Sequence, residues 1–152
     1  MRRTATLTVT LAVACAMLAA PPAAAQVVDP PEGQSTQNST SCTRSRYAPS
    51  GHMCLYLNGT GTWLNYARVI RNTLPYTNQN SWLCDYRSRL RFRYPSGNVI
   101  THYSGRHNGC TWNTAWFQYG WYSYVPKGTL VCGAWWTSNR RYADGIACNR
   151  IG

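Results

Sequence analysis

Acidic residues are scarce in this sequence, and Lys127 is its single lysine. The 152 residues include four carboxylates, at Asp29, Glu32, Asp85 and Asp144, against 15 lysine and arginine residues. The formal net charge is +11. An imbalance of this size favours acidic partners, such as an anionic polymer, nucleic acid or the acidic surface of another protein. The alternative is that the basic charge only keeps an exported protein soluble.

Known catalytic signatures are also missing. The sequence has no G-x-S-x-G, H-E-x-x-H or phosphate-binding glycine loop. Besides His52, the chain has His102 and His107, which could form an acid–base pair or bind a metal, but their spacing alone supports neither role. No cysteine pair has the C-x-x-C spacing typical of a zinc site. We expect a protein that is not an enzyme and has no metal or cofactor.

Helix-forming patterns are absent, and β-strand residues are plentiful. No apolar run has a 3.6-residue period, and tyrosine and tryptophan, with 11 and 7 copies, are set among many Gly, Asn, Ser and Thr residues. The pattern predicts one all-β domain over 42–152, a small disulfide-bonded β-sandwich. Its expected strands are Met53–Leu57, Ala67–Asn72, Leu83–Tyr94, Val99–Tyr103, Ala115–Tyr124, Thr129–Thr137 and Gly145–Arg150. Turn signals separate them, at Asn58-Gly59, Pro95–Asn98, Asn108-Gly109 and Pro126–Gly128.

The first 25 residues are typical of a signal peptide. Two arginines precede an apolar run, Ala5–Ala20, and Pro-Pro-Ala-Ala-Ala follows the run, so Gln26 is the expected first residue of a secreted, extracellular protein. A membrane anchor is the alternative, but the apolar run is short for a bilayer span and prolines follow it at once. Cys15 raises a lipoprotein alternative, although it lies inside the apolar run. We expect no membrane span in the mature form.

Six cysteines follow the signal peptide, and an even number in an exported chain indicates a disulfide framework. They are Cys42, Cys54, Cys84, Cys110, Cys132 and Cys148. Six cysteines allow 15 connectivities. Pairing of neighbours along the chain is the simplest of these, and the sequence leaves the choice open.

Residues 26–41 differ in composition from the rest of the chain. The segment has no aromatic residue and no basic residue, and it contains Asp29 and Glu32. Such a segment buries too little apolar area to offset its ordering entropy, so we expect a flexible acidic arm. The arm could fold back on the basic domain, or it could add a strand to a partner protein.

Arginine alternates with apolar residues along the predicted strand Leu83–Tyr94. Successive side chains of a strand point to opposite faces, so Leu90, Phe92 and Tyr94 should face the core. The other face then carries a row of guanidinium groups about 7 Å apart, here called the arginine row: Arg87, Arg89, Arg91 and Arg93. Planar guanidinium groups bind carboxylates, phosphates and sulfates through two hydrogen bonds. The alternative is an ordinary solvated strand face whose charges discourage aggregation.

Tryptophan is the second candidate for binding. Trp112, Trp116, Trp121, Trp135 and Trp136 form either an aromatic core or a surface for stacking on sugars or bases. We expect mainly the core. Trp135 and Trp136 are adjacent, so one of the two should be exposed and is a candidate contact residue, together with the arginine row.

The stretch Ala48–Tyr56, with Pro49-Ser50-Gly51 and Cys54-Leu55-Tyr56, is followed by a Gly-rich loop at Gly59–Thr62. Over residues 48–72 the chain resembles the secreted Streptomyces metalloproteinase inhibitor family of actinobacteria. The resemblance implies a βγ-crystallin-like fold and a non-catalytic protein that binds an extracellular protease or a related enzyme. It does not extend to the second half of the chain, and no inhibitory loop can be carried over.

Three functional hypotheses follow. The first is an inhibitor of an extracellular protease. The second is an adaptor subunit of a secreted antibacterial toxin complex, of the umbrella-particle type, which would dock a partner protein with the segment 26–41. The third is a binder of an anionic polymer or glycan through the arginine row.

Overall fold

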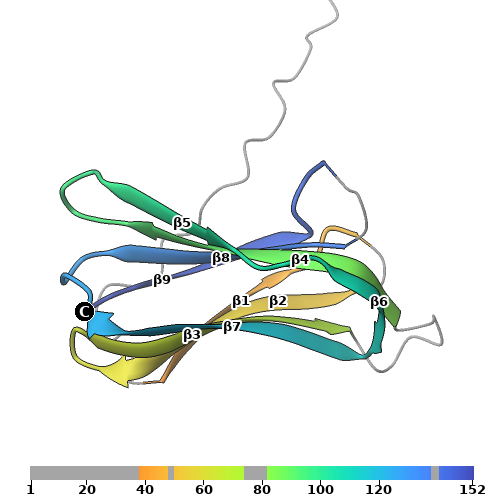
Figure 1. Cartoon of the computed structure of the whole chain (residues 1–152), viewed down its shortest axis with the longest axis horizontal. Coiled ribbons are helices and arrows are strands. Elements are labelled where there is room, and N and C mark those ends of the chain that lie inside the picture. Colours follow the sequence, from red (N-terminus) through yellow and green to blue (C-terminus); the bar gives the residue numbers. More distant parts are fainter. Residues whose placement is uncertain (1–37, 48–49, 74–81, 138–140) are drawn as a thin grey trace, which may run out of the picture.

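The chain folds into two antiparallel β-sheets that lie face to face, as the computed structural model shows (Figure 1). The structure describes residues 38–47, 50–73, 82–137 and 141–152, and these contain strands and no helix. The predicted all-β, disulfide-bonded sandwich is confirmed. The signal peptide prediction and residues 26–37 of the expected arm lie outside the described residues. The βγ-crystallin-like topology implied by the family resemblance stays a prediction.

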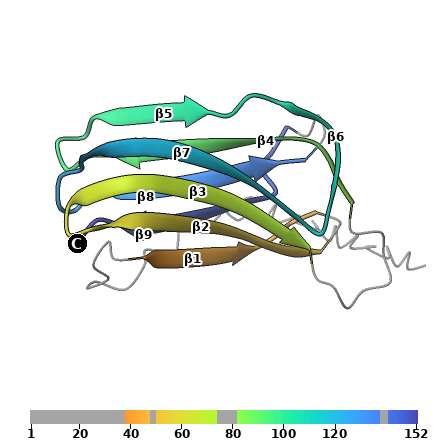
Figure 2. The ribbon, with the colours of Figure 1, turned by 60° about the horizontal axis from the view of Figure 1, so that its bottom comes forward.

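Nine strands build the two sheets. Their bounds are β1 Ser39–Arg44, β2 Gly51–Thr60, β3 Trp63–Thr73, β4 Trp82–Arg93, β5 Val99–Tyr103, β6 His107–Trp112, β7 Thr114–Tyr124, β8 Leu130–Trp136 and β9 Gly145–Arg150. The first sheet has the order β1-β2-β3-β7, and the second has the order β5-β4-β8-β9, with β6 pairing the beginning of β4. Figure 2 shows the two stacked layers from a second direction, with β5 and β1 at opposite sides of the molecule.

The hairpin predicted around Pro95–Asn98 is confirmed. β4 and β5 pair antiparallel with Arg93 opposite Val99. The turn closes through hydrogen bonds from the Tyr94 amide to the Asn98 carbonyl (2.9 Å) and from the Gly97 amide to the Tyr94 carbonyl (2.9 Å). Gly97 has a φ of 87°, which a residue without a side chain adopts at little cost.

The first strand begins inside the segment that was expected to be an arm. β1 starts at Ser39 and pairs residue by residue with β2, from Ser39–Leu57 to Arg44–His52. Its Ser and Thr residues suit an edge strand, most of which is exposed or half-buried. The composition that indicated disorder therefore also fits a polar edge strand, and the folded domain starts before the expected boundary at residue 42.

A second strand, β6, replaces the turn predicted at Asn108-Gly109. Asn108 and Gly109 lie in β6 at a bulge, where the pairing with β4 shifts between Cys84 and Tyr86. Asp85 has a φ of 49° in this bulge, and its carboxylate accepts a hydrogen bond from the Gly109 amide at 3.3 Å. The turn prediction was wrong because glycine and asparagine also suit a bulge, where one strand carries an extra residue.

The three disulfides pair neighbouring cysteines along the chain: Cys42–Cys54, Cys84–Cys110 and Cys132–Cys148. In each pair the two cysteines lie directly opposite one another on adjacent antiparallel strands. The bridges therefore attach β1, β6 and β9 to their neighbours within a sheet. Each of these three strands has one partner in the described residues, so the bridges fasten strands that hydrogen bonds hold on one side only.

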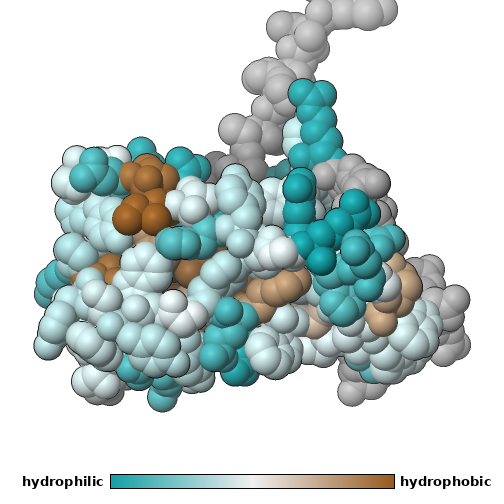
Figure 3. Space-filling model, viewed as in Figure 1, coloured by the Kyte–Doolittle hydropathy of each residue, from teal (hydrophilic) through white to brown (hydrophobic). Residues whose placement is uncertain are grey.

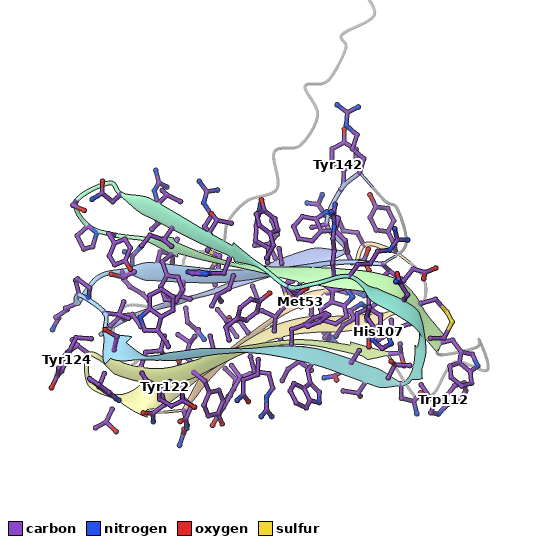
Figure 4. The ribbon with its side chains drawn as sticks, in the orientation of Figure 1. Met53, His107, Trp112, Tyr122, Tyr124 and Tyr142 are labelled. Carbon is purple, nitrogen blue, oxygen red and sulfur yellow. A yellow bond between two sulfur atoms is a disulfide. The ribbon has the colours of Figure 1, made fainter. Side chains whose placement is uncertain are left out.

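The core lies between the two sheets and follows the two-residue period of the strands. Met53, Leu55 and Leu57 of β2 are fully buried, as are Leu90 and Phe92 of β4. Figure 4 shows Met53 in the space between the layers. Aromatic rings fill the middle of this core, where the Trp135 ring stacks on Tyr86 with centroids 4.9 Å apart, and Phe92 stacks on Trp121 at 4.2 Å.

Candidate functional site

The arginine row lies on the outer face of the second sheet, as its alternation predicts. Leu90 and Phe92 are fully buried, whereas Arg87, Arg91 and Arg93 are exposed and Arg89 is half-buried. The row occupies β4, which pairs with β8 from Arg87 to Arg93 and with β5 from Arg89 to Arg93. Hydrogen bonds to two strands hold the backbone of the row, so the sheet fixes the spacing between the side chains.

The guanidinium groups of the row have no acidic partner within the described residues. The ion pair found among the described residues joins Arg71 to Asp144, and both of these side chains are buried. The Nε atom of Arg89 is buried and lacks a hydrogen-bond partner among the described residues. Two adjacent unit charges 7 Å apart in water repel by about 0.6 kcal/mol, and this repulsion is relieved when an anion binds. The row is therefore an uncompensated positive surface.

Trp136 is the exposed member of the adjacent tryptophan pair. It lies opposite Arg87 in the β4–β8 register and is half-buried. The guanidinium carbons of Arg87 and Arg89 lie 5.6 and 5.2 Å from the centroid of its ring. Cation–π contacts of this kind contribute about 0.5–1 kcal/mol each at exposed sites, so the ring helps to orient two of the four arginines.

Trp135 points the other way and is fully buried, so of the two candidate contact residues Trp136 alone lies at the surface. The Trp135 ring packs against Tyr86 and Phe117 in the core. The sequence predicted that one of the two would be exposed, but the choice between them depends on the register of β8 against β4.

Uncharged side chains flank the row on both sides. Directly opposite residues of an antiparallel pair share a face, so β5 contributes Val99, Thr101 and Tyr103. β8 contributes Leu130, Cys132, Ala134 and Trp136 by the same register. Figure 3 shows hydrophobic surface over the β4–β5 hairpin, where Val99 is 43% exposed. The four arginines therefore form one row of charge, and the residues that share their face on the two neighbouring strands are uncharged.

Tyr103 belongs to this face, although the sequence reasoning did not single it out. It lies opposite Arg89 and is 65% exposed. The predicted hairpin contained the signal, because closing the chain at Pro95–Asn98 and pairing outward from Arg93 and Val99 brings Tyr103 to Arg89. An aromatic ring thus stands on each side of the row, Tyr103 from β5 and Trp136 from β8.

The other tryptophans divide between core and surface. Trp121 packs on the core, but Trp112 and Trp116 are 52% and 54% exposed, so the expectation of a core position was wrong for these two. Trp112 ends β6 and Trp116 belongs to β7, because Asn113 turns the chain between the two strands with a φ of 60°. Trp116 lies on the outer face of the first sheet, where the Arg68 guanidinium is 4.6 Å from its ring centroid.

His102, His107 and Asp144 contact residues outside the arginine row. His107 on β6 stacks on Tyr86 with centroids 4.5 Å apart, and His102 on β5 meets the edge of Trp121 at 5.2 Å. Asp144 is buried with Arg71, whose pKa is lowered by burial, while the Asp144 carboxylate acts to raise it. Among the described residues no three histidine, cysteine or acidic side chains are grouped as metal ligands.

No protein-family model, curated protein or solved structure matches the chain. The resemblance to the metalloproteinase inhibitor family over residues 48–72 therefore stays a prediction. The described residues include no helix with the length and apolar character that a membrane span requires.

Proposed function

We propose that this protein is a secreted, non-catalytic binding protein that recognises a linear polyanion through the arginine row. The observation that carries the proposal is the row itself: four arginines on one strand face, without a carboxylate partner in the described residues, beside the aromatic ring of Trp136. Arginine is the side chain best suited to carboxylate, phosphate and sulfate groups, because its planar donors make paired hydrogen bonds to them.

The disulfides support the extracellular part of the proposal. Three bridges in a small domain fit an oxidising compartment, since the cytosol keeps most thiols reduced. One of them, Cys132–Cys148, also fastens β9 to β8, which is a neighbour of the arginine row. A rigid sheet fixes the backbone positions of the four arginines before binding, and this preorganisation favours affinity.

Salt-dependent binding tests the proposal. We expect the chain beginning at Gln26 to bind heparin, polyglutamate or a single-stranded oligonucleotide, measured by fluorescence anisotropy. If four arginines each neutralise one phosphate of a single strand, the affinity should fall about 50-fold between 50 and 200 mM salt. Replacement of all four arginines of the row by glutamine should abolish this binding.

A matched control separates the row from net charge. Arg44, Arg46, Arg68 and Lys127 are exposed or half-buried, and they lie outside the second sheet. Glutamine at these four positions removes as many positive charges as the row variant and should leave most of the binding in place. Equal losses in the two variants, or no binding to any of the three polyanions, would refute the proposal.

The inhibitor and adaptor hypotheses stay predictions from the sequence. Stoichiometric inhibition of a secreted protease tests the first, and a panel of such proteases left fully active would count against it. Stable co-purification of a partner from culture medium tests the second. Since β1 begins at Ser39, a deletion that probes the acidic segment should end at residue 37, so that the strand and its Cys42–Cys54 bridge stay intact.

A further inference from the structure

The spacing of the arginine row carries information about its ligand beyond charge. Alternate residues of a strand are separated by six backbone bonds, which advance about 7 Å in an extended chain. The four arginines therefore cover about 20 Å along β4. A ligand that meets all four at once must be extended and must repeat its negative charge at the same interval.

We infer that the arginine row binds a single extended polyphosphodiester chain, with one phosphate at each arginine. This inference rests on the proposed function and narrows it to one chemistry. A phosphodiester backbone in which three carbons separate the oxygens also has six bonds between successive phosphorus atoms, so its extended repeat is about 7 Å by the same bond geometry. Single-stranded nucleic acid and poly(glycerol phosphate) share this repeat.

The surroundings of the row fit a single chain better than a duplex. The residues opposite the row on β5 and β8 are uncharged, so a second line of phosphates would meet no cation on either neighbouring strand. Adjacent strands lie about 5 Å apart, which leaves the row one charge wide. The strands of a DNA duplex wind away from a straight line, so a duplex brings fewer phosphates to the row.

Tyr103 and Trp136 give a reason to favour a chain that carries flat groups beside its phosphates. The two rings come from opposite sides of the row, at Arg89 and Arg87 in the strand registers. Tyr103 is 65% exposed, and the Trp136 ring is already in contact with two guanidinium groups. Aromatic side chains next to a basic track are the usual platform for unpaired bases.

An acidic peptide with carboxylates at alternate positions has the same repeat and is the strongest competing ligand. Its carboxylates stand at the ends of side chains whose rotamers must be fixed on binding, whereas phosphates belong to the backbone of their polymer. An extended peptide also gains its backbone hydrogen bonds at the edge of a sheet, and the row lies on a face. The geometry thus favours the phosphodiester.

Length-defined probes test the inference on the chain beginning at Gln26, by anisotropy or by competition. Oligothymidylates of increasing length should gain affinity with each phosphate up to four and little beyond. A duplex of equal length should bind more weakly than the single strand when affinity is compared per phosphate. Poly(glycerol phosphate) with the same number of phosphates should show the same length dependence. Lysine at the four row positions should weaken phosphodiester binding about tenfold, because lysine lacks the paired donors.

Two variants distinguish single-stranded nucleic acid from poly(glycerol phosphate) as the ligand. If the ligand is single-stranded nucleic acid, oligothymidylate should bind about tenfold more tightly than poly(glycerol phosphate), and Tyr103→Ala or Trp136→Ala should remove this advantage. Tyr103 is largely exposed, so its replacement leaves the core intact even if Trp136→Ala perturbs folding. Equal affinity for the two polymers, unchanged in both variants, would assign recognition to the phosphate repeat alone.

Other outcomes overturn the inference. A Glu-Ser repeat peptide has the same repeat, so if it binds as tightly as oligothymidylate of equal charge, the row does not distinguish phosphodiesters from carboxylates. Inorganic polyphosphate has only two bonds between successive phosphorus atoms, and equally tight binding of this polymer would show that the row recognises charge without regard to repeat. The proposed function would survive either result. Failure of every probe to bind would refute both the inference and the proposed function.

Discussion

The guanidinium group of Arg71 on β3 lies 4.0 Å from the carboxylate of Asp144, and both side chains are buried. Arg71 also donates hydrogen bonds to the Ser45 hydroxyl at 2.7 Å and to the Asn72 carbonyl. Asp144 accepts one from the Thr137 hydroxyl. Arg71 belongs to the first sheet, and Asp144 immediately precedes β9 of the second. An ion pair therefore connects the two layers at one place in the core.

Removing one partner of this pair should destabilise the fold strongly. Arg71→Met leaves a buried carboxylate without its cation, and Asp144→Asn leaves a buried cation, so each should cost about 3–5 kcal/mol in urea denaturation. The double variant should cost less than the sum of the two, because neither charge is then left alone. Arg44→Met, at an exposed position of β1, is the control and should change stability by about 0.5 kcal/mol or less. Additive single effects would mean that the pair does not act as a unit.

Gly51 lies against Arg71, one member of this pair. A Cβ atom built there would lie 1.9 Å from the Asn72 carbonyl oxygen and 2.6 Å from Nη1 of Arg71. Gly51→Ala should therefore cost about 3 kcal/mol, since backbone must move to make room. Gly105→Ala is the matched control, because a Cβ atom at Gly105 meets nothing within 4 Å. Similar stability of the two variants by thermal unfolding would contradict the close approach at Gly51.

The disulfides should rank by the length of chain that they close. The cysteine pairs are separated by 12, 16 and 26 residues for Cys42–Cys54, Cys132–Cys148 and Cys84–Cys110. Replacing a pair by alanine should cost about 3 kcal/mol, and loss of Cys84–Cys110 should cost about 0.7 kcal/mol more than loss of Cys42–Cys54. Denaturant titration of the three double variants measures the order. The reverse order would show that loop entropy does not set the relative contributions of the three bridges.

Tyr119 should make the stability fall at alkaline pH. Its hydroxyl lies 2.6 Å from the Ser88 hydroxyl, and burial raises its pKa above the ordinary value of 10.0, while hydrogen bonds to Ser88 and Ser104 oppose the rise. Because the pKa is raised in the folded state, the contribution of the Tyr119 hydroxyl to folding stability is complete below pH 10. This contribution is lost as the pH rises through the pKa of the folded state.

Tyr119→Phe isolates this contribution. At pH 8 the variant should be less stable than the parent by about 1 kcal/mol, because the hydrogen bond to Ser88 is lost. The gap should narrow above pH 10, since only the parent then loses stability through this hydroxyl. Unfolding measured from pH 8 to 11 provides the comparison, and a constant gap would show that Tyr119 keeps its ordinary pKa.

Local alternation made part of the candidate site predictable. The sequence from Arg89 to Tyr94 alternates arginine with apolar side chains, and a strand has one way to bury the apolar set. The same alternation was visible in β3, where Ala67, Val69 and Arg71 share a face, so an arginine in the core could have been suspected. Nothing local pointed to Asp144 as its partner, because the two residues meet only when the sheets pack.

The wrong predictions for β1, β6 and the two exposed tryptophans share a physical cause. β1 is polar because it is an edge strand, and β6 contains a bulge with turn-forming residues, so local composition described each one wrongly as an arm or a turn. Trp112 and Trp116 were expected in the core, but Asn113 places them on different strands and leaves both exposed. These choices depend on strand pairing across the chain, which composition does not encode.

The sequence by itself determined the all-β class, the set of six cysteines and the orientation of the arginine row, because these depend on composition and on the two-residue period of a strand. The tertiary structure decided which cysteines pair, which of Trp135 and Trp136 is exposed, and which rings stand beside the arginines. The physical reason is register: residues far apart in sequence become neighbours only when strands align, and a shift of one residue would turn every side chain to the other face.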